Sequence, residues 1–229
     1  MALNVVILGP PGAGKGTQAE RFARAHGLPK ISTGDILREA VQSGSELGHA
    51  VQAIMERGEL VSDELITGIV RERLDRADVS AGFVLDGFPR TVPQARALDE
   101  IMVGRDPLIV VEIRVPDEEL VRRVRARRVC HSCGANVSAF SADPSKAARC
   151  EKCGGELVSR ADDSEAVVRE RLRVYWRDTR PMIDYYSGRT MFHAIDGAQP
   201  PEQVRHMLLT TIAELAAGTG TATQPEAQP

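Results

Sequence analysis

Short, nearly continuous runs of apolar residues alternate along this chain with longer stretches of helical periodicity. The apolar runs predict strands at residues 3–8, 83–85 and 108–115, with weaker strands near Ile31 and at 192–195. The stretches between them predict helices at 14–26, 35–42, 47–57, 63–77, 93–103, 117–128, 164–186 and 202–216. Apolar strands that alternate with helices indicate a parallel sheet buried between two helical layers. We therefore expect an α/β fold of three layers around a five-stranded parallel sheet.

Two stretches interrupt this alternation and resemble insertions on a single core. Residues 33–61 contain helices and no strand, and residues 129–161 contain all four cysteines. The core would then consist of residues 1–32, 62–128 and 162–217. Residues 218–229 are mostly small or polar, with nothing to bury, so we expect a disordered tail.

Composition and charge exclude several classes of protein. With 229 residues, of which 42% are hydrophobic, the chain is long enough for a full core without disulfides. No apolar run is long enough for a membrane helix and no basic leader precedes the first strand, so we expect a cytoplasmic protein with no membrane partner. A net charge of -3 argues against a nucleic-acid coat protein. All but four of the 29 basic residues are arginine, which suits phosphate binding, although codon bias also explains such a count.

A glycine-rich loop follows the first predicted strand. Residues 9–17 read Gly-Pro-Pro-Gly-Ala-Gly-Lys-Gly-Thr, in which glycines let the backbone approach phosphate oxygens and Lys15 reaches the β and γ phosphates. A tight strand-to-helix turn is the alternative reading. Gly16 stands where most such loops carry a Ser or Thr ligand of Mg²⁺. We therefore expect phosphate oxygens and waters to hold Mg²⁺, with Asp86 as an outer anchor; an ordinary turn or cap role for Asp86 stays open.

Two further segments place arginines just past strand ends, where open α/β sheets bind ligands. They read Ser-Thr-Gly-Asp-Ile-Leu-Arg at residues 32–38 and Asp-Gly-Phe-Pro-Arg-Thr at residues 86–91. Together with the glycine-rich loop, these segments closely resemble the adenylate kinases, and the match runs nearly collinearly from Val5 to about Val204. It includes Gly-Glu-Leu-Val-Ser-Asp-Glu-Leu from residue 58, Arg-Ala-Asp-Asp from residue 160 and Ile-Asp-Gly from residue 195.

The resemblance implies a P-loop kinase that reversibly transfers a phosphoryl group from MgATP to AMP, giving two ADP. Such an enzyme would be a monomer that serves purine nucleotide interconversion and energy-charge homeostasis. Residues 33–61 would be a mobile AMP-binding segment and residues 129–161 a mobile lid. The resemblance also implies a cis bond between Phe88 and Pro89.

The resemblance assigns two sets of nucleotide-binding residues. ATP would be bound by Gly12, Ala13, Gly14, Lys15, Gly16, Thr17, Arg123, Arg127 and Gln199. AMP would be bound by Thr33, Arg38, Glu59, Leu60, Val61, Gly87, Arg90, Gln94, Arg160 and Arg171. The carboxamide of Gln94 also suits adenine on chemical grounds, because it can pair with the amino group and the adjacent ring nitrogen; a surface glutamine is the alternative.

Phosphoryl transfer needs alignment and charge compensation more than it needs a base. The expected catalytic residues are Lys15, Arg90, Arg127, Arg160, Arg171 and Asp86. Arg123 and Arg127 are four residues apart on the predicted helix, so we expect them on one face. Asp162 and Asp163 would hold Arg160 or pair with groups across the closed lid.

The four cysteines form two Cys-x-x-Cys pairs, Cys130 with Cys133 and Cys150 with Cys153, separated by sixteen residues. This pattern predicts a structural zinc site in which four thiolates complete a tetrahedron. Disulfides are the alternative, and they are disfavoured in a reducing cytoplasm. The segment has few large apolar residues, so we expect zinc to supply its folding energy.

Other functions fit part of the pattern. Another nucleoside monophosphate kinase would use a different acceptor base, although Thr33 and Gln94 favour AMP. A nucleic-acid-dependent ATPase would combine a P-loop with a zinc ribbon, but the acidic charge and only 4% aromatic residues argue against it. A catalytically silent nucleotide sensor is disfavoured by the intact lysine and arginines. Many members of the adenylate kinase family carry an aromatic residue and an Asn-Pro-Pro stretch in the lid, whereas this chain reads Asn-Val-Ser-Ala-Phe-Ser-Ala-Asp-Pro-Ser from residue 136. ATP contacts near Asn136 and Val137 are therefore left open.

Overall fold

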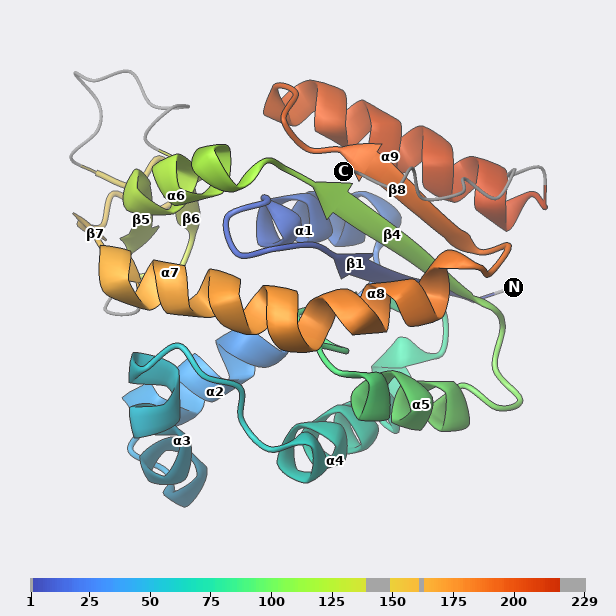
Figure 1. Ribbon diagram of the computed structural model, residues 1–229, viewed down its shortest axis with the longest axis horizontal. Helices are drawn as coiled ribbons and strands as arrows, with labels where there is room; N and C mark the ends of the chain where they lie inside the picture. The colour runs from blue at the N-terminus through green and yellow to red at the C-terminus, as the bar shows by residue number, and fades with distance from the viewer. Residues whose placement is uncertain (1, 139–148, 161–162, 219–229) are drawn as a thin grey trace.

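A five-stranded parallel sheet forms the centre of the computed structural model, which describes residues 2–138, 149–160 and 163–218. The strands are β1 (Leu3–Leu8), β2 (Lys30–Ser32), β3 (Gly82–Asp86), β4 (Leu108–Arg114) and β8 (Phe192–Asp196). Their order across the sheet is β2-β3-β1-β4-β8, and every neighbouring pair is parallel. The predicted α/β class with five parallel strands is confirmed (Figure 1).

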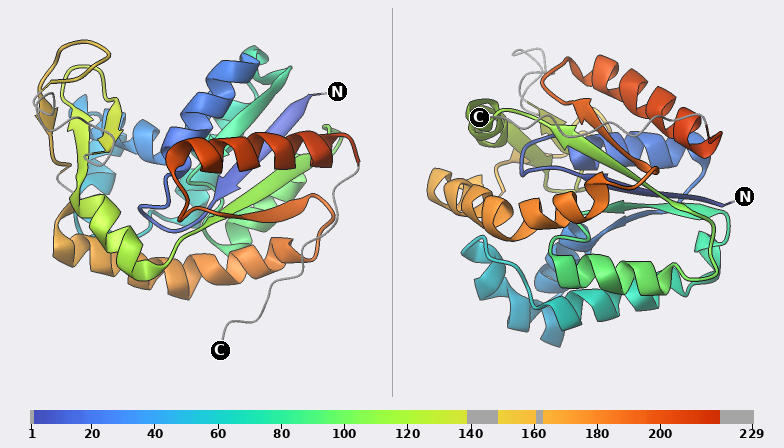
Figure 2. Two further views of the ribbon diagram at one scale, coloured as in Figure 1. Left: turned by 90° about the horizontal axis from the view of Figure 1, so that it is seen from above. Right: turned by 45° about the vertical axis from the view of Figure 1, so that its right-hand side comes forward.

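Helices cover both faces of this sheet. They are α1 (Lys15–His26), α2 (Thr33–Gln42), α3 (Glu46–Glu56), α4 (Asp63–Leu74), α5 (Val92–Ile101), α6 (Asp117–Arg125), α7 (Glu165–Val174), α8 (Arg180–Ser187) and α9 (Pro201–Ala216), with a 3₁₀ turn at Ala77–Val79. Helices α1 and α9 lie on one side, and α4, α5 and α8 lie on the other (Figures 1 and 2). In the described ranges, no helix has both the length and the apolar character needed to cross a membrane.

The continuous apolar runs of the strands reflect burial on both faces. In β1, Val5 and Ile7 belong to the hydrophobic cluster that includes Phe22 of α1. Val6 and Leu8 belong to the opposite cluster, which also includes residues of α4, α5 and α8. Successive side chains of a strand point to opposite faces, so a strand packed on both sides needs apolar residues at every position.

The predicted helix at 164–186 is confirmed as a continuous helical segment, but its middle is not α-helical. It consists of α7, a π-helical turn at Tyr175–Thr179 and α8, which run on as one rod across the front of the molecule (Figure 1). At the end of the π turn, the backbone N–H of Arg180 donates to the carbonyl of Tyr175, five residues back. Pro181 follows directly and has no N–H to donate, so a regular α-helical bond from that position is impossible and the wider turn accommodates it.

A second, smaller sheet lies at the end of the molecule that α2 and α3 also occupy (Figure 1). It is antiparallel and consists of β5 (Arg127–Cys130), β6 (Asn136–Ser138) and β7 (Leu157–Val158), in the order β6-β5-β7. The predicted helix at 117–128 is therefore too long: α6 ends at Arg125, and the chain turns to pair with β6 and β7. The expected tail beyond Gly218 and part of the expected lid, residues 139–148, lie outside the described residues.

Candidate active site

The glycine-rich loop joins β1 to α1 as predicted. Gly14 caps α1 with a φ of 91°, in the left-handed region that glycine adopts most readily. A Cβ on Gly12 would lie 2.8 Å from Cγ2 of Val124, so this position has no room for a side chain. The amides at the start of α1 face the loop, which is the arrangement that binds phosphate at a helix N-terminus. Ala13 is buried within the loop and Thr17 is exposed on α1.

Gly16 lies against Asp86 at the end of β3. A Cβ built on Gly16 would lie 3.1 Å from Oδ2 of Asp86, which is closer than an ordinary van der Waals contact. A Ser or Thr at position 16 would therefore crowd the carboxylate. Position 16 therefore supplies no hydroxyl ligand for Mg²⁺. The carboxylate of Asp86 lies beside it instead, and carboxylate oxygens suit a hydrated Mg²⁺.

Lys15 lies among charged groups of both signs. Its Nζ donates to the carbonyl oxygen of Pro10 at 2.8 Å. Burial lowers the pKa of Lys15 to about 7, opposed by the negative charge of Asp86 and reinforced by the positive charges of Arg90, Arg171 and Arg127. An anionic ligand would restore the lysine charge, because it would replace lost solvation with direct attraction.

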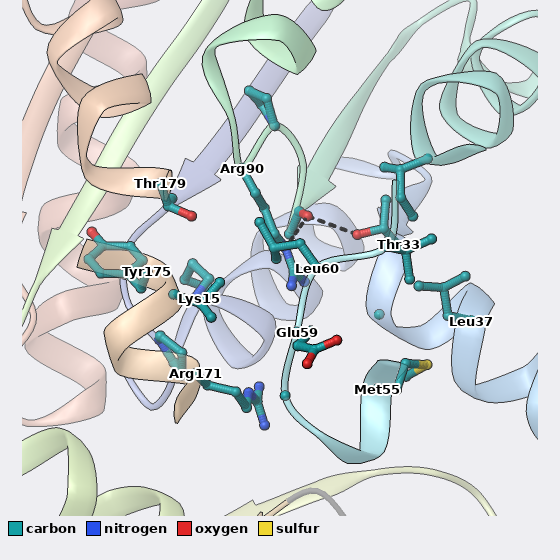
Figure 3. A pocket seen from close by; sticks show the side chains of 18 of the residues that line it. Lys15, Thr33, Leu37, Met55, Glu59, Leu60, Arg90, Arg171, Tyr175 and Thr179 are labelled. Atoms are coloured by element: carbon teal, nitrogen blue, oxygen red, sulfur yellow. Dashed lines mark hydrogen bonds between the residues drawn. The ribbon is translucent and has the colours of Figure 1, made fainter. Parts of the chain in front are cut away.

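The loop after β3 and the start of α2 meet through Gly87. Its carbonyl oxygen accepts hydrogen bonds from Oγ1 of Thr33 at 2.8 Å and from Nε of Arg90 at 2.7 Å (Figure 3). Gly87 has a φ of +82°, and a Cβ on it would lie 2.9 Å from Nη2 of Arg90. The Phe88–Pro89 bond that follows is cis, in agreement with the prediction. Gly87 thus brings Thr33 and Arg90 together.

A pocket opens between these loops, α2, the segment before α4 and the α7 rod. Figure 3 shows Lys15 and Arg171 on one side of it, and Thr33 and Leu37 on the other. The pocket gathers these residues predicted from sequence: Lys15, Thr33, Arg38, Glu59, Leu60, Val61, Gly87, Arg90, Gln94 and Arg171.

Tyr175 and Thr179 also line this pocket, and neither was predicted from the sequence. Both belong to the π-helical turn, four residues apart, and lie on the same side of the pocket as Lys15 (Figure 3). Burial raises the pKa of Tyr175 above its usual range, with a further contribution from the negative charge of Glu112. Pro181 is the one feature of the sequence that indicates an irregularity here, because proline interrupts helical hydrogen bonding. It does not show that Tyr175 and Thr179 face the pocket.

A buried carboxylate joins two of the predicted catalytic arginines. The side chain of Asp163, only 3% exposed, accepts from Nε of Arg127 at 2.7 Å and from a second Arg127 nitrogen, and Nη1 of Arg171 lies 3.4 Å from it. Arg160 is partly buried at the end of the segment after β7, and its carbonyl accepts from the backbone N–H of Asp163. Asp162 lies outside the described residues.

The expectation that Arg123 and Arg127 share one helical face is wrong, because Arg127 belongs to β5 and not to α6. Arg123 instead donates to the carbonyl of Gly197 at 2.8 Å, in the loop that contains Gln199. Gln199 is exposed and donates to Asp196 at 2.7 Å. The two predicted ATP residues Arg123 and Gln199 thus lie by the loop after β8, away from the pocket described above.

Arg38 and Glu59 are held by neighbours at the pocket rim. Nη2 of Arg38 lies 2.5 Å from Oδ1 of Asp35. Burial raises the pKa of Asp35, but the hydrogen bond and charge of Arg38 and the charge of Lys30 outweigh it and lower the pKa to about 2. Glu59 pairs with Arg57 and is largely exposed. The guanidinium group of Arg38 therefore lines the pocket while it is paired with the carboxylate of Asp35.

The four cysteines converge on one point of the small sheet. Their Sγ atoms all lie within 4.8 Å of one another, with 3.4 Å between Cys130 and Cys153 and 3.6 Å between Cys133 and Cys150. A tetrahedral zinc with Zn–S bonds of about 2.3 Å has sulfur atoms about 3.8 Å apart, so these thiols fit that ion. All four are free cysteines, and the disulfide alternative finds no support.

Comparisons with known proteins agree with this geometry. The sequence model of the family described as Adenylate kinase matches residues 7–191. The chain is 50% identical over 204 residues to an adenylate kinase of Archaeoglobus fulgidus, covering 88% of this chain and 94% of that protein. It is 47% identical over 212 residues to one of Thermosipho africanus, covering 92% and 99%, and 45% identical over 216 residues to one of Methanosarcina acetivorans, covering 93% and 100%.

Proposed function

This chain belongs to the adenylate kinase family, and we propose that it transfers the γ-phosphoryl group of MgATP to AMP by in-line displacement and reverses that reaction with two ADP. The observation that carries the proposal is the pocket that brings Lys15 of the P-loop close to Arg90 and Arg171. These cations lie where the charge of a migrating phosphoryl group needs compensation.

The acceptor AMP would occupy the pocket beside α2. Thr33 and Gln94 line it with Leu37, Val61 and Ile66, so polar groups sit among apolar walls that suit a purine. Arg38 and Arg90 would bind the AMP phosphate. ATP would lie along the P-loop with its adenine between Arg123 and the loop that contains Gln199.

Arg127, Arg160 and Arg171 would clamp the phosphate chains of both nucleotides. Asp163 binds Arg127 and approaches Arg171, which keeps both guanidinium groups beside the P-loop. Phosphates would compete with this carboxylate for the same donors. Asp163 would therefore keep Arg127 and Arg171 in position to bind phosphate, and its negative charge would reduce the repulsion between them.

Two groups that the protein would bind have separate roles. Mg²⁺ bound with ATP would neutralise phosphate oxygens, and Asp86 would hold its water shell beside the P-loop. Zinc would be bound by Cys130, Cys133, Cys150 and Cys153 and would stabilise the lid without taking part in the chemistry.

Water must be excluded from the reacting phosphate, or ATP would be hydrolysed. We assign this role to closure of residues 33–61 and 129–161 over the two nucleotides. The described parts of the two segments, namely α2 and α3 on one hand and the small sheet on the other, lie at the same end of the molecule (Figure 1). Opening of the lid after the reaction would then limit turnover.

The function is tested by ADP production from ATP and AMP together, compared with ATP alone. Rapid ADP formation is expected only when both nucleotides are present. Replacing AMP by CMP, UMP or GMP tests the rival acceptors, each of which we expect to be converted much more slowly. Hydrolysis of ATP alone at a comparable rate, or a preference for another acceptor, would contradict the proposal.

We also propose that the protein is a cytoplasmic monomer. None of the four cysteines forms a disulfide, and thiolate ligands for zinc suit a reducing compartment; the proposed reaction takes place within one chain. Sedimentation equilibrium with and without nucleotide tests the monomeric state, and a concentration-dependent mass would contradict it.

A further inference from the structure

Both ends of the Gln94 carboxamide have a partner in the protein. Gln94 is 2% exposed and lies in the wall of the pocket. Its Oε1 accepts from the backbone N–H of Arg90 at 2.8 Å, and its Nε2 donates to Oδ1 of Asp63 at 2.7 Å. A backbone N–H can only donate and a carboxylate can only accept, so these partners fix which end of the amide is oxygen and which is nitrogen.

Asp63 is itself held in place. It is the first residue of α4, where a negative charge is favoured by the helix dipole. Oγ1 of Thr91 donates to its carboxylate, with 3.0 Å to each oxygen. The same hydroxyl caps α5 by accepting from the backbone N–H of Gln94 at 3.3 Å. Asp63 therefore connects the start of α4 rigidly to the start of α5.

The fixed amide has one N–H and one oxygen lone pair left for a ligand. A 6-aminopurine offers an amino donor beside a ring-nitrogen acceptor, which complements this pair. A 6-oxopurine such as hypoxanthine or guanine offers a carbonyl acceptor beside a ring N–H, the reverse order. An amide free to rotate would pair with either base by turning over, whereas a fixed amide pairs with one and leaves the other with unpaired buried polar atoms.

We propose that Asp63 is a positioning residue that sets acceptor specificity: together with the backbone N–H of Arg90, it holds Gln94 in the orientation that pairs with 6-aminopurine nucleotides and opposes 6-oxopurine nucleotides. This inference rests on the proposed function, because it concerns the acceptor site for AMP. Asp63 would act through Gln94, to which it is hydrogen-bonded, and not on the phosphoryl group itself.

The test compares AMP with inosine monophosphate, which differs from AMP at the 6-position edge of the base and lacks the extra amino group of guanine. In Asp63→Ala we expect the ratio of kcat/KM for AMP to that for inosine monophosphate to fall at least ~10-fold, the lower range of discrimination by one bidentate pair. The KM for ATP should stay the same. Asp63→Asn keeps an acceptor oxygen and should retain the wild-type ratio within a few-fold.

Glu64→Ala is the matched control, since it removes an exposed negative charge from the same first turn of α4. It should leave the ratio unchanged. Asp63→Ser, whose shorter side chain cannot reach Gln94, should reproduce the effect and serves if Asp63→Ala fails to fold. A structural role alone would lower the activity with both acceptors in parallel and leave their ratio constant.

An unchanged ratio in folded Asp63→Ala or Asp63→Ser would overturn the inference, as would an equal loss in Glu64→Ala. This outcome is separate from failure of the proposed function. If the wild-type protein makes no ADP from ATP and AMP, the function fails; if it does so while the Asp63 variants keep the wild-type ratio, only the inference fails.

Discussion

The protonation state of Lys15 depends on whether an anionic ligand occupies the P-loop. Its pKa of about 7, against an ordinary value of 10.5, means that at pH 8 the nucleotide-free lysine is mostly neutral while the unfolded chain keeps its proton. The unfolded state binds more protons between these two values, so the free energy of unfolding of the free protein rises with pH there. Bound phosphate would raise the lysine pKa again.

We therefore expect MgATP binding at pH 8 to be accompanied by uptake of a proton. Titration calorimetry in two buffers that differ in ionisation enthalpy would measure it as a difference between the observed heats. Lys15→Met should abolish this uptake. Identical heats in both buffers for the wild-type protein would contradict a lowered pKa for Lys15.

The arginines near the reacting phosphate should dominate turnover. We expect Arg90→Ala and Arg127→Ala each to lower kcat at least ~10²-fold, a barrier increase of about 3 kcal/mol, because charge on the migrating group would lose a cation. Arg169→Ala, which removes an exposed arginine of α7 that pairs only with Glu165 in the described contacts, provides the control. Steady-state rates within a few-fold of wild type in the first two variants would refute their assignment.

Among helices and strands, the sequence predicted best those elements whose pattern is set by burial on two sides. The core strands of the main sheet are apolar at successive positions because both faces are covered, and their bounds agree closely with the structure. Strands β5, β6 and β7 were missed because they are short and pair only with one another beside the cysteines. These strands form where four cysteine thiols from two distant parts of the chain meet, and no local pattern of apolar residues predicts that pairing.

The residues of the candidate site also fall into those that the sequence could predict and those that required the structure. Lys15, Thr33 and Arg90 follow strand ends, so their convergence could be predicted from the topology of a parallel sheet. Tyr175 and Thr179 come from the middle of a rod whose π turn decides which side chains face the pocket, and helical periodicity cannot show that. The contact between Asp63 and Gln94 joins the starts of two different helices and required the structure.

The small sheet should depend on metal for its order. Structural zinc sites contribute roughly 10 to 16 kcal/mol of folding free energy, far more than this segment's few apolar residues. A chelator should therefore remove hydrogen-exchange protection from β5 and β7 while β1, β3 and β4 keep theirs. Metal analysis would verify complete removal, and unchanged protection and melting of metal-free protein would exclude the structural role.

The protein as a whole should change shape when both nucleotide positions are filled. A bisubstrate mimic that joins two adenosines through five phosphates would bridge the P-loop and the pocket beside α2. We expect tight binding and a smaller radius of gyration by X-ray scattering, because both outer segments would fold over the phosphates. AMP alone is the control and should give a smaller change. Weak binding of the mimic would contradict the end-to-end placement of two nucleotides.

The rod formed by α7, the π turn and α8 has a consequence for unfolding. Val168 and Leu172 at its start pack into the cluster on one side of the sheet, whereas Met182, Ile183 and Tyr186 near its end pack into the cluster on the other. Neither cluster can lose its packing without exposing part of the same continuous helix. The two halves of the core are thus mechanically joined, and heating should melt them together in one cooperative calorimetric transition.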